Sequence, residues 1–177
     1  MAVIVSFSSR KGGNCGKIGA YLANMIPDSQ LFSFADFTIR PCGDCGYECF
    51  QSREACPHFQ DMEYRLMDAI TNSMAAIFVV PNYCDYPNAN FFAFNERSQC
   101  YFQGRPELLD RYLAVPKKFI VVSNTGKANF RETFTQHTDQ EPEILFLSAK
   151  QYGKVSVNGD LLPSEPVEAA LRAFLEG

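Results

Sequence analysis

Residues 2–17 read Ala2-Val3-Ile4-Val5-Ser6-Phe7-Ser8-Ser9-Arg10-Lys11-Gly12-Gly13-Asn14-Cys15-Gly16-Lys17. The apolar run over residues 2–7 predicts a buried strand, and the apolar spacing over residues 15–26 predicts an amphipathic helix that ends at Pro27. Glycines in the polar loop between them let the backbone approach an anion, and the amides at the start of the helix point toward it. The stretch therefore predicts an anion-binding loop; the alternative is a glycine-rich turn that only reverses the chain.

The rest of the chain repeats this alternation of buried strands and amphipathic helices. We expect further strands over residues 31–34, 75–80, 119–123 and 144–147, with helices near 61–73, 89–97, 106–113, 128–137 and 165–176. Pro81 should stop the third strand, and the Asn-Gly pair at 158–159 predicts a small hairpin. The pattern predicts an α/β fold with a five-stranded parallel sheet in the flavodoxin-like order 2-1-3-4-5 and helices on both faces. We expect a single domain over residues 1–177, with a cysteine-rich insertion at about 35–60.

Composition excludes several classes of function. The net charge is −4 and no run of basic residues extends beyond Lys117-Lys118, so we expect no nucleic-acid partner. No apolar run approaches the length of a membrane span, so we expect no membrane partner either. Seven cysteines without an export signal suggest a reducing, cytoplasmic location, where clustered cysteines indicate metal or redox chemistry more often than disulfides.

Ligands of such a sheet bind beyond the carboxyl ends of the strands, which directs attention to the loops after the first, third and fourth strands. In the second of these loops, Tyr83 is the candidate aromatic wall for a flat ring, although tyrosines in loops are also common core residues. The third loop, residues 124–126, offers a ligand only close contact with its backbone. The candidate cofactor-binding residues are Ser8, Arg10, Asn14, Cys15, Pro81, Asn82, Tyr83, Asn124, Thr125 and Gly126.

These motifs resemble the NADPH-dependent FMN reductase family of the flavodoxin-like superfamily. Residues 8–15 are similar to its Gly-Ser-Pro-Arg-Lys-x-Gly-Asn-Thr phosphate loop, with Phe7, Ser9 and Cys15 in place of the glycine, proline and threonine. Residues 81–87 are similar to its Pro-x-Tyr-x-x-x-Pro segment beside the flavin ring, and residues 93–97 to its lysine-alanine-phenylalanine helix. The resemblance covers residues 2–148 and implies FMN as cofactor, NADPH or NADH as electron donor, and a homodimer.

Four cysteines cluster in the insertion with the spacing Cys42-x2-Cys45-x3-Cys49-x6-Cys56. The cluster resembles the four-cysteine loop of iron–sulfur flavoproteins, although their middle gap is usually two residues. Thiolates at such spacing can hold an iron–sulfur cluster or zinc, and the alternative is a loop of reduced thiols without a metal. Because the loop follows the second strand, we expect it near the flavin side of the sheet. The remaining cysteines, Cys15, Cys84 and Cys100, are expected to be packing residues.

Flavin chemistry needs no catalytic triad, since hydride passes directly to the cofactor. The sequence therefore predicts an FMN-dependent NAD(P)H oxidoreductase that passes electrons to a small-molecule acceptor such as a flavin or a quinone. The alternative is an electron-transfer flavoprotein, with or without an iron–sulfur cluster, that serves a protein partner.

Overall fold

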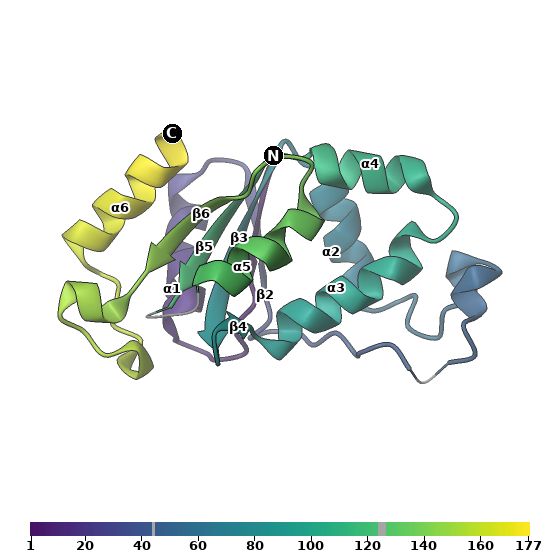
Figure 1. The fold of residues 1–177 in the computed structure, drawn as a ribbon, viewed down its shortest axis with the longest axis horizontal. Coiled ribbons are helices and arrows are strands. Elements are labelled where there is room, and N and C mark those ends of the chain that lie inside the picture. The colour runs from purple at the N-terminus through teal and green to yellow at the C-terminus, as the bar shows by residue number, and fades with distance from the viewer. Residues whose placement is uncertain (44, 124–126) are drawn as a thin grey trace.

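The computed structural model describes residues 1–43, 45–123 and 127–177. Helices and strands alternate through most of the chain (Figure 1). The strands are β1 (Ala2–Ser6), β2 (Ser29–Ser33), β3 (Ala75–Tyr83), β4 (Tyr86–Pro87), β5 (Lys117–Val122) and β6 (Glu143–Leu147). The α-helices are α1 (Asn14–Met25), α2 (Met62–Thr71), α3 (Ala89–Phe102), α4 (Pro106–Ala114), α5 (Lys127–Phe134) and α6 (Glu165–Glu176). Short 3-10 helices are η1 (Glu48–Phe50), η2 (Arg53–Ala55), η3 (Thr135–His137), η4 (Ala149–Tyr152) and η5 (Ser156–Asn158).

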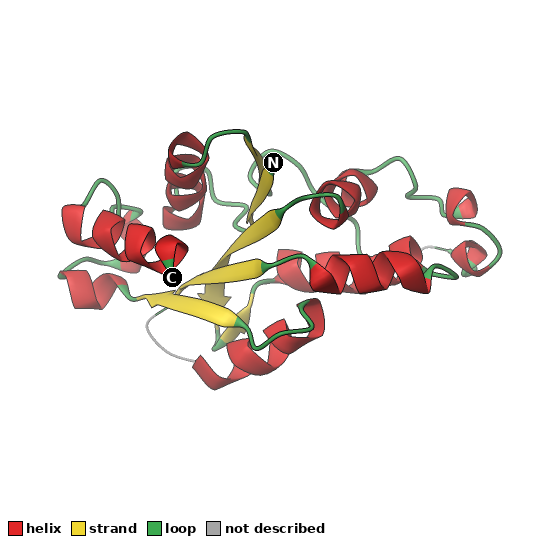
Figure 2. Ribbon diagram, turned by 90° about the horizontal axis from the view of Figure 1, so that it is seen from above, coloured by secondary structure: helices red, strands yellow, loops and turns green. Residues whose placement is uncertain are grey.

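The main sheet has the order β2-β1-β3-β5-β6, and every neighbouring pair in it is parallel. Counted without the two-residue β4, which pairs antiparallel with β3, this is the expected order 2-1-3-4-5. The parallel strands lie between layers of helices when the molecule is viewed from above (Figure 2). The flavodoxin-like fold expected from the sequence is confirmed.

Each central strand is apolar on both sides because helices cover both faces of the sheet. On β3, Phe78 faces a core built with α2, α3 and α5, whereas Ile77 and Val79 face a second core built with α1 and α6. Cys15 belongs to this second core and is buried, as expected of a packing residue, and Cys100 is also buried, whereas Cys84 is exposed and its expected packing role was wrong. Burial of such continuous apolar strands is what drives this layered arrangement.

Two local predictions were wrong. Pro81 does not stop the third strand: β3 continues to Tyr83, and Pro81 pairs with Val122 of β5. The ladder of hydrogen bonds between β1 and β3 ends at Val79. Pro81 has no N–H to donate, and it lies beyond the part of β3 that pairs with β1, so no hydrogen bond of the ladder is lost. The predicted hairpin at residues 157–160 is instead the 3-10 helix η5, and Gly159 follows it with φ +67°. A left-handed residue there turns the chain back toward β1 rather than into a second strand.

Candidate functional site

The loop after β1 has the compact form expected of an anion-binding turn. The amide of Arg10 donates to Ser8 Oγ at 3.2 Å, and the amide of Gly13 donates to the carbonyl of Arg10 at 3.2 Å. Gly12 has φ +70°, a conformation that side chains disfavour, and Gly13 precedes the first turn of α1. The loop therefore delivers the amides at the start of α1 to the carboxyl edge of the sheet, where the helix dipole favours negative charge.

The side chains of this loop are held by a distant segment, residues 155–161, which we call the covering segment. Asn14 uses both ends of its carboxamide there, since Nδ2 donates to the carbonyl of Ser156 at 3.0 Å and Oδ1 accepts from the amide of Leu161 at 3.0 Å. Arg10 Nη2 donates to the carbonyl of Val157 at 2.5 Å. Asn14 is one of the candidate cofactor-binding residues, and in this structure its side chain anchors the covering segment.

The second ligand loop is a tight hairpin between β3 and β4. Cys84 and Asp85 are its two turn residues, and both have positive φ, +53° and +67°. This is the geometry of a type I′ turn, whose twist matches that of the flanking strands. Asn82 stabilises the turn by accepting from the amide of Asp85 at 2.8 Å, and its Nδ2 donates to Ser123 Oγ at the end of β5. Asn82 therefore connects the second loop to the start of the third.

Two cavities meet at this edge of the sheet, and Arg10 and Tyr83 line both of them. The smaller, about 170 Å³, is lined by the first two loops and by the covering segment. The larger, about 530 Å³, lies over the start of α3 and is within the size range of small-molecule sites. The expected residues that the smaller cavity brings together are Ser8, Arg10, Asn14, Cys15, Pro81, Asn82 and Tyr83. The remaining expected residues, Asn124, Thr125 and Gly126, lie outside the described residues.

Sequence reasoning missed two asparagines in the larger cavity, Asn88 and Asn90. Both donate from Nδ2 to the carbonyl of Phe7 at 2.7 Å, and Asn90 also donates to Ser9 Oγ at 2.8 Å. They thereby fix the start of α3 to the first ligand loop. The sequence feature that could have identified them is a pair of asparagines, two residues apart, directly after the second ligand loop.

The sizes and linings of these cavities could accommodate a cofactor that carries a phosphate and a flat ring. A small subsite beside helix-start amides and Arg10 suits a phosphate, and the larger cavity beside the ring of Tyr83 suits a flat ring. Tyr83 is 60% exposed, so its ring is available for such a contact. A further cavity of about 530 Å³ lies at the opposite edge of the sheet, among residues such as Ala75, Pro116 and Leu175, and shares no residue with the ligand loops.

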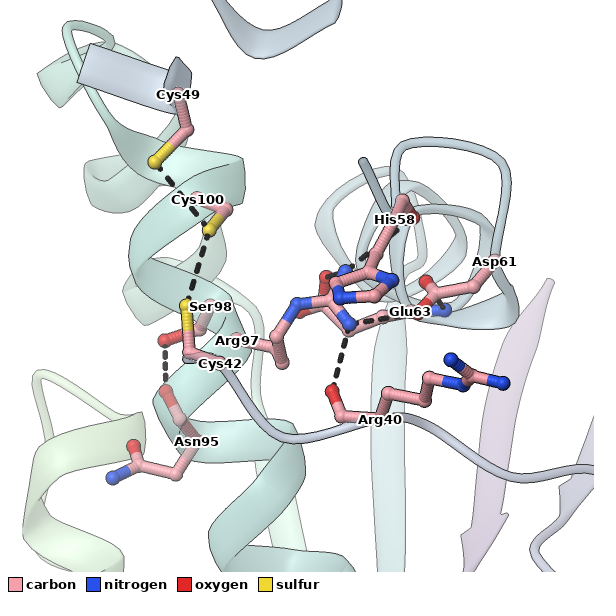
Figure 3. A network of polar contacts seen from close by, with 10 residues as sticks. All are labelled: Arg40, Cys42, Cys49, His58, Asp61, Glu63, Asn95, Arg97, Ser98 and Cys100. Carbon is pink, nitrogen blue, oxygen red and sulfur yellow. Dashed lines mark hydrogen bonds and ion pairs between the residues drawn. The ribbon is translucent and has the colours of Figure 1, made fainter. Parts of the chain in front are cut away.

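The cysteine-rich insertion lies away from this edge, so its expected place near the flavin side was wrong. Cys100, near the end of α3, has its sulfur 3.6 Å from that of Cys49 and 4.0 Å from that of Cys42 (Figure 3). Cys100 is eleven residues beyond Ala89, about 16 Å along the helix axis from the larger cavity. The insertion contacts both α2 and α3, since Phe59 packs on Tyr64 while Cys42 and Cys49 lie beside Cys100.

The cysteines that lie close together in the structure differ from the four that were grouped by their spacing in the sequence. The three sulfur atoms of Cys42, Cys100 and Cys49 form a chain, and burial raises the pKa of the Cys100 thiol. Cys45 is half-buried and Cys56 is buried. Among residues 1–43, 45–123 and 127–177, no three His, Cys, Asp or Glu side chains are grouped as a metal site. Metal binding by Cys42, Cys45, Cys49 and Cys56 remains a prediction.

A buried polar network supports the base of the insertion. Arg97 of α3 is fully buried and donates to Asp61 Oδ2 at 2.7 Å and to the carbonyl of Arg40 at 2.8 Å (Figure 3). A second carboxyl group, that of Glu63, is also fully buried and lies 4.0 Å from the same guanidinium. Burial raises the pKa of Glu63 to about 8, although Arg97 opposes that shift. The network joins the insertion to α2 and α3 and takes no part in either cavity at the sheet edge.

Comparisons with known proteins support the fold. No protein-family model matches the sequence, and no curated protein matches it by sequence. Several solved structures are similar to this chain, and two of them match it over nearly its whole length. The Trp repressor binding protein from Bacillus subtilis has a TM-score of 0.58 and 14% identity, over 97% of this chain and 96% of that one. The flavoenzyme NAD(P)H:(acceptor) oxidoreductase FerB from Paracoccus denitrificans has a TM-score of 0.54 and 15% identity, over 99% of this chain and 94% of that one.

No helix in the described parts of the chain is long and apolar enough to cross a membrane. The strand order and the likeness to these two structures together show that the chain has a flavodoxin-like fold.

Proposed function

We propose that this protein binds FMN at the carboxyl edge of its sheet and is an NAD(P)H-dependent oxidoreductase. The observation that carries the proposal is the pair of adjoining cavities, one beside the helix-start amides and one beside Tyr83, with Arg10 lining both. The likeness to a flavoenzyme that oxidises NAD(P)H supports it at the level of the fold. FMN would supply hydride acceptance and electron transfer, and the acceptor is a small molecule such as a flavin or a quinone.

The residues of this chain would bind and orient the cofactor. Backbone amides at the start of α1 and the free donors of Arg10 would hold the phosphate, because charge-assisted hydrogen bonds are the stronger ones. The ring would lie over the larger cavity against Tyr83, with Asn88 and Asn90 keeping the start of α3 in place. None of these side chains has to exchange a proton with the substrate.

We also propose a homodimer. Tyr83 and Tyr86 are cross-strand neighbours in the hairpin beside the cavities, and they are 60% and 50% exposed. Two exposed aromatic rings beside a ligand site suit an interface in which a second copy covers the flavin. Light scattering of the purified protein would measure the mass directly, and a mass of 19.9 kDa would exclude the dimer.

The first test is the difference in affinity between FMN and riboflavin. Reconstituted protein should bind FMN far more tightly, because only FMN has the phosphate. Arg10→Ala should weaken FMN binding by roughly 1.5–3 kcal/mol, the range for a hydrogen bond to a charged group, and weaken riboflavin binding much less. Lys11→Ala removes the same charge from the adjacent exposed position and is the matched control. Equal affinity for FMN and riboflavin would refute the phosphate subsite.

The second test separates the enzyme from an electron carrier. Anaerobic stopped-flow mixing with NADPH or NADH should bleach the bound flavin within seconds if the protein is a reductase. Failure of both donors, together with rapid reduction by a redox protein, would instead favour an electron-transfer flavoprotein.

A further inference from the structure

Four hydrogen bonds connect the covering segment to the first ligand loop and α1, across more than 140 residues of sequence. Besides the bonds from Arg10 and Asn14, Lys17 Nζ donates to the carbonyl of Gly159 at 2.6 Å. The bonded groups of the segment are the carbonyls of Ser156, Val157 and Gly159 and the amide of Leu161. Two of these three donating side chains, Arg10 and Asn14, are also candidate cofactor-binding residues, so they are shared between the ligand loop and this segment.

The backbones of the two segments also touch. Gly159 has φ +67°, and a Cβ atom at this position would lie 2.8 Å from the carbonyl oxygen of Gly12. Gly12 itself has φ +70° and open space around the position of its missing side chain. The approach at Gly159 therefore requires a glycine for two reasons, its backbone conformation and the contact with the ligand loop.

From these contacts we infer that the covering segment forms one wall of the phosphate subsite and positions Arg10 for the phosphate. The inference rests on the proposed function and extends it to residues that neither the sequence nor the comparisons assign. Ser156 and Val157 line the small cavity together with Ser8, Arg10 and Gly13. The segment thus contributes surface to the same subsite that the loop provides.

The contacts favour a covering segment that positions Arg10 over one that competes with the phosphate for Arg10. Val157 accepts from a single nitrogen of Arg10, and a guanidinium has five N–H donors in a rigid plane. Fixing one nitrogen sets the direction of the others and removes the cost of ordering a long side chain when the ligand binds. Asn14 is held at both ends of its carboxamide, so the segment cannot shift without breaking bonds to the first turn of α1.

A matched pair of glycine variants tests the inference. Gly159→Ala and Gly153→Ala both place alanine at nearly the same positive φ, +67° and +66°, so both carry the same backbone cost, and Gly159→Ala should lose additional thermal stability through its contact with Gly12. Only Gly159→Ala pushes against the ligand loop, because nothing lies within 4 Å of the missing Cβ of Gly153. We expect Gly159→Ala to weaken FMN binding at least about tenfold, as when one charge-assisted bond is lost, with riboflavin affinity unchanged. Gly153→Ala should change neither affinity.

A second pair keeps the test valid if Gly159→Ala fails to fold. Lys17→Met removes the bond from α1 to Gly159, whereas Lys11→Met removes an equal charge from an exposed position in the adjoining ligand loop. We expect weaker FMN binding in Lys17→Met than in Lys11→Met, again without a change for riboflavin.

The possible outcomes distinguish the inference from the proposed function. If wild-type protein binds FMN but the members of each pair behave alike, the inference is refuted and the proposed function stands. Tighter FMN binding in Gly159→Ala would also refute it, since the segment would then compete with the phosphate. If wild-type protein does not bind FMN, both are refuted.

Discussion

Two carboxyl groups share one buried cation in the network at the base of the insertion, and they should respond to substitution in opposite ways. Asp61 lies 2.7 Å from the guanidinium of Arg97 and already balances its charge. Glu63 lies 4.0 Å away, is fully buried, and has no hydrogen-bond partner for either carboxyl oxygen among the described residues. Removing it from water favours its neutral form, and the pKa of Glu63 rises from 4.5 to about 8. We therefore expect Glu63→Gln to stabilise the protein at neutral pH.

The magnitude follows from the proton linkage. In the unfolded chain Glu63 loses its proton near pH 4.5, whereas in the folded chain it keeps the proton until about pH 8. Between these values the folded state binds more protons, so the free energy of unfolding falls as the pH rises, by about 1.4 kcal/mol per unit. At pH 7 this amounts to at most about 3 kcal/mol. Glutamine does not titrate, so the advantage of Glu63→Gln should be near zero at pH 4.5 and grow to that value at pH 7.

Urea unfolding of both proteins, followed by circular dichroism at pH 4.5, 6 and 7, would measure this difference. Titration of all other groups is common to both proteins and cancels in the comparison. Asp61→Asn is the contrasting variant, because asparagine still caps α2 but no longer balances Arg97. It should destabilise the protein by roughly 3 kcal/mol, the lower end of the range for a broken buried pair, since Asp61 is 23% exposed. A Glu63→Gln protein that is less stable than wild type at every pH would show that Glu63 is ionised and paired, and would refute the reasoning.

Two further predictions concern other buried groups and thiols. Burial lowers the pKa of Lys117 from 10.5 to about 7, so the unfolded chain binds the extra proton between these values and stability rises with pH across this window. The free energy of unfolding of Lys117→Met, measured with urea, should therefore exceed that of wild type by most near pH 7, and this excess should shrink toward pH 10. A difference in unfolding free energy that does not change with pH would contradict the burial effect. Cys84 lies exposed in the turn of the β3–β4 hairpin, whereas Cys15 is buried and its pKa is raised to about 12. A thiol reagent at pH 8 should therefore modify Cys84 rapidly in the folded protein, and a fast phase that persists in Cys84→Ser would have to come from another thiol.

Local patterns in the sequence were enough to predict most of the architecture. Alternation of apolar strands and amphipathic helices identified the parallel strands, because burial on both faces leaves a continuous apolar run in each strand, and their order followed from the flavodoxin-like fold. The position of the first ligand loop followed from the same run ending at Phe7 and the glycines after it. The turn at Cys84 and Asp85 was missed, since neither residue is a glycine or asparagine of the kind that marks such hairpins.

Contacts between distant residues were decided only by the tertiary structure. Cys100 meets Cys42 across 58 residues, and Asn14 meets Ser156 across 142 residues. Such pairs have no fixed spacing in the sequence, so no local pattern predicts them. They depend on how α3 and the segment after β6 pack on the sheet. The position of the ligand loop could be predicted from local sequence, because strand, turn and helix propensities act over a few residues. Which groups face that loop was determined by packing, because only the folded chain brings residues 155–161 to it.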